Sequence, residues 1–241
     1  MSTVLYEKKD RVAYVTINRP AAGNKVSLEL VQELSEVCEE INRDDEVTVV
    51  LLTAAGTEAF CAGSETESDA AGSLALIEKP VIAVVNGDCF GEGLEIALSC
   101  DLRIAADTAK FGFPWLESGT IPADGGTQRL PRLIGKGKAL ELILTADIIT
   151  AAEALDIGLV SKVVPASELA AEAEKLVRGI STKAPVSLRY VKEAVNKGMD
   201  MTLEQGLRLE ADLYMLIHTT EDRSEGITAF LQKRTPEFKG K

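Results

Sequence analysis

The chain has 241 residues, of which 46% are hydrophobic and only 5% aromatic, enough apolar surface for one large domain with a mainly aliphatic core. Its formal net charge of −12 argues against a nucleic-acid partner, which would need a concentrated basic face. The four cysteines lack metal-ligand spacing and no apolar run reaches membrane-spanning length, so we expect a cytoplasmic protein with free thiols, no metal site and no membrane contact.

The first half of the chain alternates strands and helices. Aliphatic or β-branched runs predict three strands, at 12–18, 47–56 and 79–87. Ser27 predicts the N-cap of a helix whose apolar face repeats at helical spacing, through Val31, Leu34, Cys38 and Ile41. Because the second and third strands are almost entirely apolar, the order strand, helix, strand favours a parallel sheet.

The middle of the chain continues this pattern, and the last part is helical. Residues 93–100 predict a short helix that opens on glycines, 101–106 predict another strand, and 140–158 read as helical. Four further helices are predicted after Pro165, at 168–179, at 188–197, from 203 onward and at 224–232. We therefore expect an α/β body at residues 1–180 and a helical region at residues 181–241.

Two glycine-bearing loops follow buried strands, at residues 59–65 and 86–95. Small residues let backbone N–H groups approach a ligand closely, and the second loop also leads into a helix N-terminus, which favours negative charge. One N–H from each loop would make an oxyanion hole, although the glycines would also suit simple turns. The GxGxxG and Walker patterns are absent at both places, so neither loop predicts a dinucleotide or nucleoside-phosphate site.

Glu95 lies in the first turn of the short apolar helix "GLEIALSC". Its carboxylate is either solvated on an open face or buried for a purpose. Burial would raise its pKa and make it an acid/base near neutrality, although the helix dipole opposes that shift. His218 is the single histidine, and we interpret it as a surface or packing residue rather than part of a nucleophilic dyad.

Trp115, the single tryptophan, follows Pro114 and stands two residues before Glu117. It either fills a gap in the core or forms the wall of a pocket. If this segment is extended, Trp115 and Glu117 point to the same face. A pocket with an aromatic wall would favour a flat or cyclic ligand, because aromatic rings stack on planar conjugated groups.

Several segments, taken in order, resemble the crotonase (enoyl-CoA hydratase/isomerase) superfamily over essentially the whole chain. They are "VAYVTINRP", "AFCAGS", "KPVIAVVNG", "EIALSCDLRIA", "GTIPADGGTQRLPRLIG", "GLVSKVVP" and "FLQKRTPEF". The resemblance implies an α/β fold built as a spiral of ββα units at residues 1–180. It also implies a C-terminal helical region at 181–241 that drives assembly into a homotrimer or hexamer. The family acts on acyl thioesters, so no cofactor is expected apart from coenzyme A as part of the substrate.

The resemblance also implies an oxyanion hole that polarises the thioester carbonyl. By position, its donors are the backbone N–H groups of Ser64 and Glu92, with Gly63, Gly93 and Trp115 at the substrate pocket. Glu92 departs from the family, which usually has glycine there. An added carboxylate beside an oxyanion is unfavourable unless it is neutral or points away, and we expect it to point away.

Glu95 matches the first of the two catalytic glutamates of the hydratases, whereas the second would fall at Trp115. An indole N–H donates hydrogen bonds but does not shuttle protons at neutral pH. Asp124, which matches a catalytic aspartate of dienoyl-CoA isomerases, and Glu117 are the carboxylates that would substitute. Dehalogenases of the family carry the tryptophan, but their nucleophilic aspartate would fall at Ala123.

A second departure is the short segment 64–78, where the family usually has a longer insert that helps to cover the adenine end of coenzyme A. Either this cover is reduced, or the printed sequence omits a segment. Lys25, in the N-terminal loop, and Lys233, near the C-terminus, are our candidates for binding the coenzyme A phosphates. Each would equally suit an ordinary surface lysine.

The leading hypothesis is an enzyme that hydrates an enoyl thioester, including dienoyl or cyclic acyl groups, through a stabilised enolate with Glu95 as acid/base. The first alternative is a double-bond isomerase, for which one carboxylate suffices. Hydrolase, decarboxylase and dehalogenase chemistry form the second alternative, and a non-catalytic acyl-CoA-binding protein forms the third. The sequence leaves open the acyl group and whether its carrier is coenzyme A or an acyl carrier protein.

Overall fold

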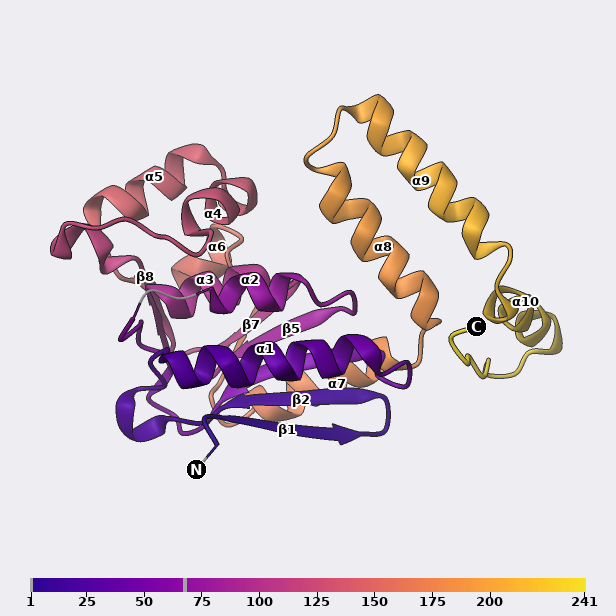
Figure 1. Ribbon diagram of the computed structural model, residues 1–241, viewed down its shortest axis with the longest axis horizontal. Coiled ribbons are helices and arrows are strands. Elements are labelled where there is room, and N and C mark those ends of the chain that lie inside the picture. Colours follow the sequence, from indigo (N-terminus) through magenta and orange to yellow (C-terminus); the bar gives the residue numbers. More distant parts are fainter. Residues whose placement is uncertain (1, 67–68) are drawn as a thin grey trace.

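A computed structural model describes residues 2–66 and 69–241. Its larger sheet has six strands in the order β1-β2-β3-β5-β7-β10, with β1 antiparallel to β2 and every other neighbouring pair parallel (Figure 1). These strands are β1 (Val4–Lys9), β2 (Val12–Ile17), β3 (Val49–Ala54), β5 (Val81–Val85), β7 (Leu102–Ala106) and β10 (Lys162–Val164). The parallel sheet predicted from the apolar strands is confirmed.

A second sheet of short strands has the order β4-β6-β8-β9. Its strands are β4 (Ala59–Cys61), β6 (Asp88–Phe90), β8 (Lys110–Gly112) and β9 (Ile149–Thr150). The strands β3, β5 and β7 are each followed by one of these short strands and then by a helix. The helices are α2 (Ala70–Ala75), α3 (Glu92–Ser99) and, after the 3-10 helix η2 (Pro114–Ser118), α4 (Gly126–Ile134). This repetition is the expected spiral of ββα units.

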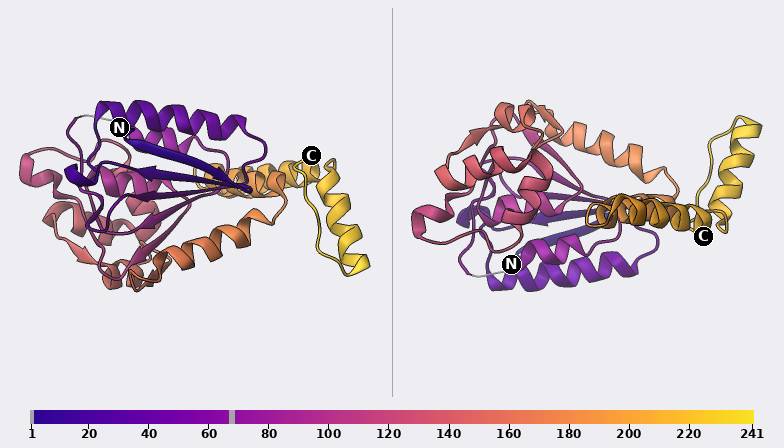
Figure 2. Two further views of the ribbon diagram at one scale, coloured as in Figure 1. Left: turned by 90° about the horizontal axis from the view of Figure 1, so that it is seen from below. Right: turned by 90° about the horizontal axis from the view of Figure 1, so that it is seen from above.

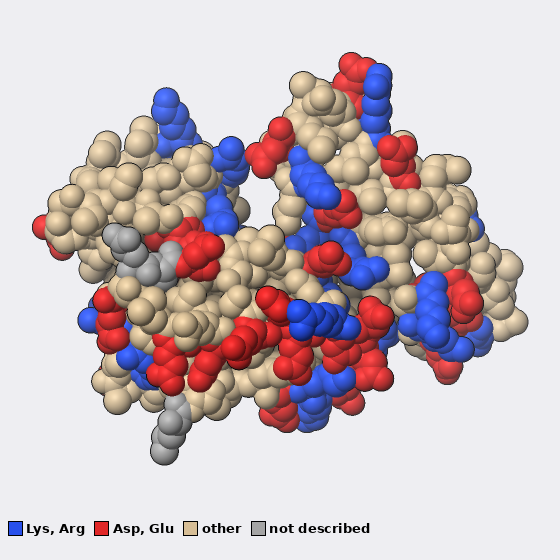
Figure 3. All heavy atoms as spheres, in the orientation of Figure 1, with Lys and Arg blue, Asp and Glu red and all other residues tan. Residues whose placement is uncertain are grey.

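Helices cover both faces of the larger sheet (Figure 2). On one face lie α1 (Leu28–Arg43), α2 and α3, and on the other lies α7 (Leu169–Ser181). Strand β3 serves both layers, because Val50 and Leu52 face the first core whereas Val49 and Leu51 face the second. The outer face of α1 is acidic, as Figure 3 shows. Its exposed carboxylates are Glu29, Glu36, Glu39 and Glu40.

The predicted start of α1 is confirmed, because the Ser27 hydroxyl accepts a hydrogen bond from the Leu30 N–H at 3.3 Å. The single helical interval predicted at 140–158 is wrong. Two helices, α5 (Lys136–Thr145) and α6 (Ala151–Asp156), are separated there by β9, which pairs with β8. A short 3-10 helix, η1 (Pro20–Ala22), follows β2.

The last three helices extend away from the α/β body (Figures 1 and 2). They are α8 (Pro185–Gly198), α9 (Leu203–Ile217) and α10 (Glu221–Gln232). Across the described ranges 2–66 and 69–241, no helix combines the length and apolar character needed to cross a bilayer.

Candidate active site

Two loops meet at the carboxyl ends of the parallel strands. The first follows β4 and contains Gly63, and the second follows β6 and contains Gly91. A Cβ built on Gly91 would lie 3.7 Å from the Gly63 Cα, so the two backbones adjoin. Both residues have positive φ, +113° at Gly63 and +54° at Gly91, which favours glycine at these positions.

The two predicted oxyanion donors lie on these loops. The Val26 N–H donates to the Gly63 carbonyl and the Glu65 N–H donates to the Val26 carbonyl, both at 2.9 Å. Ser64 lies between the two bonds, and its own N–H takes no part in this pairing with Val26. Glu92 is the first residue of α3, where backbone N–H groups point out of the helix N-terminus. The arrangement is thus compatible with two converging amides.

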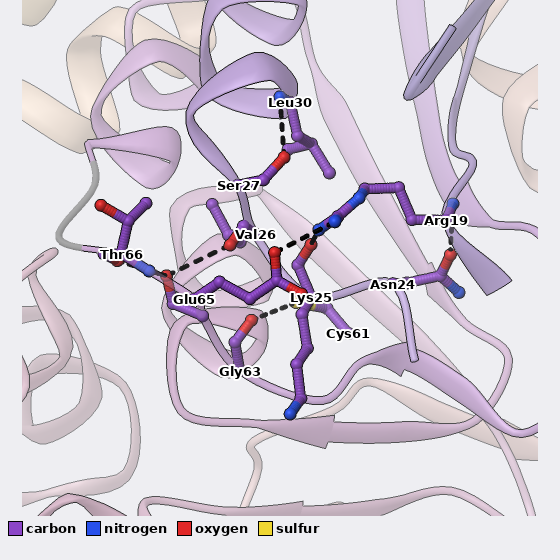
Figure 4. A network of polar contacts seen from close by, with 11 residues as sticks. Arg19, Asn24, Lys25, Val26, Ser27, Leu30, Cys61, Gly63, Glu65 and Thr66 are labelled. Atoms are coloured by element: carbon purple, nitrogen blue, oxygen red, sulfur yellow. Dashed lines mark hydrogen bonds and ion pairs between the residues drawn. The ribbon is translucent and has the colours of Figure 1, made fainter. Parts of the chain in front are cut away.

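A polar network holds the Ser64 loop to the loop after β2 (Figure 4). The Arg19 guanidinium forms an ion pair with Glu65, with 3.0 Å between Nη2 and Oε2, and it also donates to the Lys25 carbonyl. The Arg19 N–H donates to the Asn24 side-chain oxygen at 2.9 Å. The exposed side chain of Lys25 extends away from this network, so it is available to a ligand.

Gly93 has a packing role in the structure. A Cβ built on it would lie 2.2 Å from the carbonyl oxygen of Cys61 in β4, closer than any real contact. Glycine therefore allows α3 to pack directly on β4. This contact fixes the α3 N-terminus beside the Ser64 loop.

Glu95 is fully buried at the centre of these elements, with 0% of its surface exposed. Its Oε1 accepts two backbone hydrogen bonds, from the Asp124 N–H at 2.8 Å and from the Gly126 N–H at 2.7 Å. A Cβ built on Gly126 would lie 3.0 Å from Oε1, so glycine makes this close approach possible. Within the described part of the chain, the other oxygen, Oε2, has no hydrogen-bond partner.

Burial raises the pKa of Glu95 from its ordinary value of 4.5 to about 7. The two backbone hydrogen bonds to Oε1 oppose this rise, whereas the negative charges of Asp124 and Glu92 add to it. The carboxyl group therefore changes protonation near neutral pH. Such a group, with one oxygen fixed and the other open, is suited to general acid/base work.

Trp115 lies half-buried in η2 and packs against the main core. The edge of its indole ring covers Gly91, since a Cβ there would be 3.2 Å from Cζ2 and 3.5 Å from Cε2. Its Nε1 is buried without a hydrogen-bond acceptor among the described residues. The ring thus borders the second glycine loop and presents an unused donor.

The assumption that the segment around Trp115 is extended is wrong, because Pro114–Ser118 forms a 3-10 helix. Residues two apart in such a helix do not share a face, and Glu117 is exposed. The structure therefore does not bring Glu117 to the buried Glu95 carboxyl.

Asp124 is buried, but its carboxylate is engaged away from Glu95. Its Oδ2 accepts a hydrogen bond from the Ala71 N–H of α2 at 2.7 Å, while Arg129 donates to its backbone carbonyl at 2.7 Å. Burial raises the pKa of Asp124, and a hydrogen bond with the Asp69 carboxyl contributes in the same direction. Asp124 thus links Glu95 to α2. Its backbone N–H binds the Glu95 carboxyl, and its side chain binds the Ala71 N–H of α2.

Lys233 lies at the other end of the molecule from the glycine loops. It is the C-cap of α10, and the segment that follows contacts the amino end of β2, where Arg11 donates to the Phe238 carbonyl at 3.1 Å. Lys25 and Lys233 therefore do not converge within one chain. His218 is exposed, as predicted, with its ring 4.8 Å from that of Tyr214.

The sequence also predicts free thiols and no metal site. Cys38, Cys61, Cys89 and Cys100 are all buried free thiols. Over residues 2–66 and 69–241, no three His, Cys, Asp or Glu side chains are grouped so as to hold a metal ion.

The repeated ββα units, with a buried carboxyl in the first turn of α3, define a protein of the crotonase class. The chain belongs to the enoyl-CoA hydratase/isomerase family, whose model matches residues 7–76 and 64–241. It is 42% identical over 251 residues to a short-chain-enoyl-CoA hydratase of Clostridium acetobutylicum, covering 97% of this chain and 96% of that protein. A crotonyl-CoA hydratase of Syntrophomonas wolfei is 40% identical over 252 residues, with coverage of 98% and 97%. An enoyl-CoA hydratase crystal structure from Bacillus anthracis matches with a TM-score of 0.95 and 38% identity, covering 99% of this chain and 100% of that one.

The comparisons also bear on the short segment 64–78. The alignments with the two relatives span 251 and 252 residues, more than the 241 of this chain, so the relatives carry residues that this chain lacks. The two matches to the family model overlap at residues 64–76. The stretch matched twice contains α2, which has six residues.

Proposed function

We propose that the protein catalyses the reversible hydration of a 2-enoyl-CoA thioester, with Glu95 as the acid/base. The observation that carries this proposal is the state of the Glu95 carboxyl. It is fully buried, held at one oxygen by two backbone amides, open at the other, and has a pKa of about 7. The relatives named as short-chain-enoyl-CoA and crotonyl-CoA hydratases support the same reaction and a short acyl chain.

In this mechanism the thioester carbonyl oxygen accepts hydrogen bonds from the backbone N–H groups of Ser64 and Glu92. Water adds to Cβ while Oε2 of Glu95 takes its proton, and negative charge develops on the carbonyl oxygen. Two amide donors and the positive end of the α3 dipole stabilise that charge. Because the site is buried, these electrostatic contributions are larger than they would be in water.

The position of Trp115 favours a second candidate, double-bond isomerisation. A single carboxyl can remove a proton from one carbon of the enoyl thioester and return it to another carbon of the resulting enolate, without a second acid. Since a tryptophan stands where the resemblance implies a second glutamate, the substitution is compatible with this simpler proton shift. Its indole face would also select flat acyl groups.

Coenzyme A enters only as part of the substrate. Lys25 is the candidate contact for its phosphates, because the lysine is exposed and follows β2 beside the Ser64 loop. We also propose assembly into a homotrimer or hexamer. A lone chain exposes many large apolar side chains on its last three helices, which supports this proposal.

Steady-state kinetics with crotonyl-CoA and with a 3-enoyl-CoA thioester test the proposal. We expect hydration of crotonyl-CoA by the wild type, and a fall in kcat of about 10²- to 10⁴-fold in Glu95→Gln. Isomerisation of the 3-enoyl thioester without hydration would support the second candidate. Binding of both thioesters without turnover of either would identify a non-catalytic acyl-CoA-binding protein.

A further inference from the structure

The two hydrogen bonds to Oε1 of Glu95 come from a short turn between η2 and α4. The donors are the N–H groups of Asp124 and Gly126, at 2.8 and 2.7 Å. Backbone N–H groups that converge on one atom in this way form a concave site for a negative charge. Their position therefore decides how well the turn orients Glu95 and stabilises its ionised form.

The peptide group between these two donors is held by Arg129. Its carbonyl oxygen, which belongs to Asp124, accepts a hydrogen bond from Nη1 of Arg129 at 2.7 Å. Arg129 lies in the first turn of α4, where its own N–H donates to the Gly125 carbonyl at 2.8 Å. Because peptide groups are rigid and are joined only at Cα atoms, a rotation of the middle group would displace the donor on either side of it.

Gly125 allows the guanidinium of Arg129 to lie directly on this turn. Its φ of +99° lies in the region that favours glycine. A Cβ built on Gly125 would collide with Nη1 of Arg129 and lie 2.8 Å from Cζ. The glycine thus serves both the backbone shape of the turn and the close packing of Arg129 against it.

Arg129 also brings positive charge to an acidic part of the molecule. The negative charges of Asp124 and Glu92 raise the pKa of Glu95. Asp69, at the N-cap of α2, raises the pKa of Asp124 in turn, whereas the positive charge of Arg129 lowers the pKa of Asp124. Arg129 therefore offsets part of the negative charge that gathers beside Glu95.

We propose that Arg129 is a positioning residue for the hydration: it holds the Asp124 carbonyl, and through it the two N–H donors that bind the Glu95 carboxylate. This inference rests on the proposed function, in which Glu95 takes a proton from water. Arg129 acts through the turn and not on the reacting atoms. If its guanidinium is removed, the two donors bind Oε1 less well, and the ionised form of Glu95 becomes less stable.

The test compares the pH profiles of crotonyl-CoA hydration for the wild type, Arg129→Met and Arg129→Lys. Methionine has neither the donor nor the charge, whereas lysine keeps the charge and can donate to the same carbonyl. We expect the midpoint of the kcat/KM profile to rise by about one pH unit in Arg129→Met, because weaker hydrogen bonds to Oε1 raise the pKa of Glu95. Its kcat at pH 7 should fall at least about tenfold. Arg129→Lys should keep kcat within about threefold of the wild type, with a midpoint close to that of the wild type.

Arg132→Met is the matched control. Arg132 lies one turn further along α4 and is exposed, and its Nη1 donates to the Gln128 carbonyl at 2.9 Å instead of to the turn before α4. Both arginines line a groove between α4 and α8, and Arg129 is half-buried there, so methionine should replace either without opening the apolar core. Thermal unfolding of each variant checks this, and Arg132→Met should keep the kcat and the midpoint of the wild type.

The outcomes separate this inference from the proposed function. A wild type that hydrates no enoyl thioester overturns the proposed function and this inference with it. A wild type that hydrates crotonyl-CoA, together with an Arg129→Met protein that keeps its kcat and midpoint, overturns the role of Arg129 alone. A lower kcat with an unshifted midpoint also overturns that role, since a smaller folded fraction would act equally at every pH. An upward shift in Arg129→Met, restored in Arg129→Lys and absent from Arg132→Met, supports the inference.

Discussion

In the proposed hydration, Glu95 sets how activity depends on pH. The proposed base must be ionised to act, and burial raises the pKa of Glu95 to about 7. We expect kcat/KM for hydration to rise with pH, with a midpoint near 7, when it is measured between pH 5 and 9. A profile that is flat across this range would contradict the assignment of Glu95 as the base.

The same carboxyl costs stability at alkaline pH. Its pKa rises from 4.5 to about 7 on folding, so between these values the folded state binds more protons, and stability falls as pH rises through this window. Above pH 7, this pKa shift lowers the free energy of unfolding by about 3 kcal/mol. Glu95→Gln keeps an acceptor for the two amides without the charge.

We therefore expect Glu95→Gln to be more stable than the wild type by up to about 3 kcal/mol at pH 8.5, and nearly equal to it at pH 4.5. Urea unfolding at both pH values measures the difference. If Glu95→Gln is less stable than the wild type by the same amount at both pH values, then ionisation of Glu95 does not destabilise the folded protein. The variant should meanwhile have lost activity, so stability and function change in opposite directions.

Asp124 connects α2 to the loop whose backbone N–H groups bind the Glu95 carboxyl. The side chain of Asp69, the N-cap residue of α2, forms no capping hydrogen bond, and Asp124 binds the Ala71 N–H instead. We expect Asp124→Ala to lose about 1–2 kcal/mol of stability, as for other lost caps. It should also lose at least about tenfold in kcat, because the Asp124 and Gly126 amides become misplaced.

Asp124→Asn is the matched variant for this prediction. Its amide oxygen still accepts from the Ala71 N–H, so kcat should stay within about threefold of the wild type. Urea unfolding and crotonyl-CoA kinetics of the two variants give the comparison. Equal losses of kcat in Asp124→Asn and Asp124→Ala would instead indicate that the Asp124 carboxyl itself transfers protons.

The long elements could be predicted from the sequence because their periodicity extends over many residues. The helix α1, with Ser27 as its N-cap, and the apolar strands β3 and β5 are examples. The second sheet could not, because β4, β6 and β8 have three residues each, too few for an alternating pattern. The 3-10 helix at Pro114–Ser118 was missed for the same reason, which made Glu117 look like a partner of Trp115.

The family resemblance implied Glu95 as a site residue, and the apolar residues around it left open whether its carboxyl is solvated or buried. Neither could predict the donors that hold this carboxyl. These are backbone N–H groups of Asp124 and Gly126, which carry no side-chain signal. The buried state of Glu92 was also unexpected. A glutamate beside a turn usually remains solvated, whereas Glu92 is 4% exposed at the start of α3, a helix that packs directly on β4.

The helical region formed by α8, α9 and α10 leaves a large apolar surface uncovered. In one chain, the exposed fractions are 64% for Val191 and 59% for Val195 on α8, 80% for Leu203 on α9, and 82% for Phe230 on α10. A surface of this size and composition usually marks a protein interface. Lys233 lies far from the glycine loops, so a contact between Lys233 and a coenzyme A bound there would require a second copy of the chain.

We therefore expect the wild type to sediment as a trimer or hexamer in analytical ultracentrifugation. Val195→Asp places a charge in the apolar surface of α8 and should shift the distribution toward monomer, since burying an unpaired carboxylate is costly. Gln32→Asp, at an exposed position on α1, is the control and should leave the assembly intact. If Lys233 of a second copy binds coenzyme A, Val195→Asp should also raise the KM for crotonyl-CoA. A monomeric wild type, or a Val195→Asp protein that assembles normally, would remove the helical region from the interface.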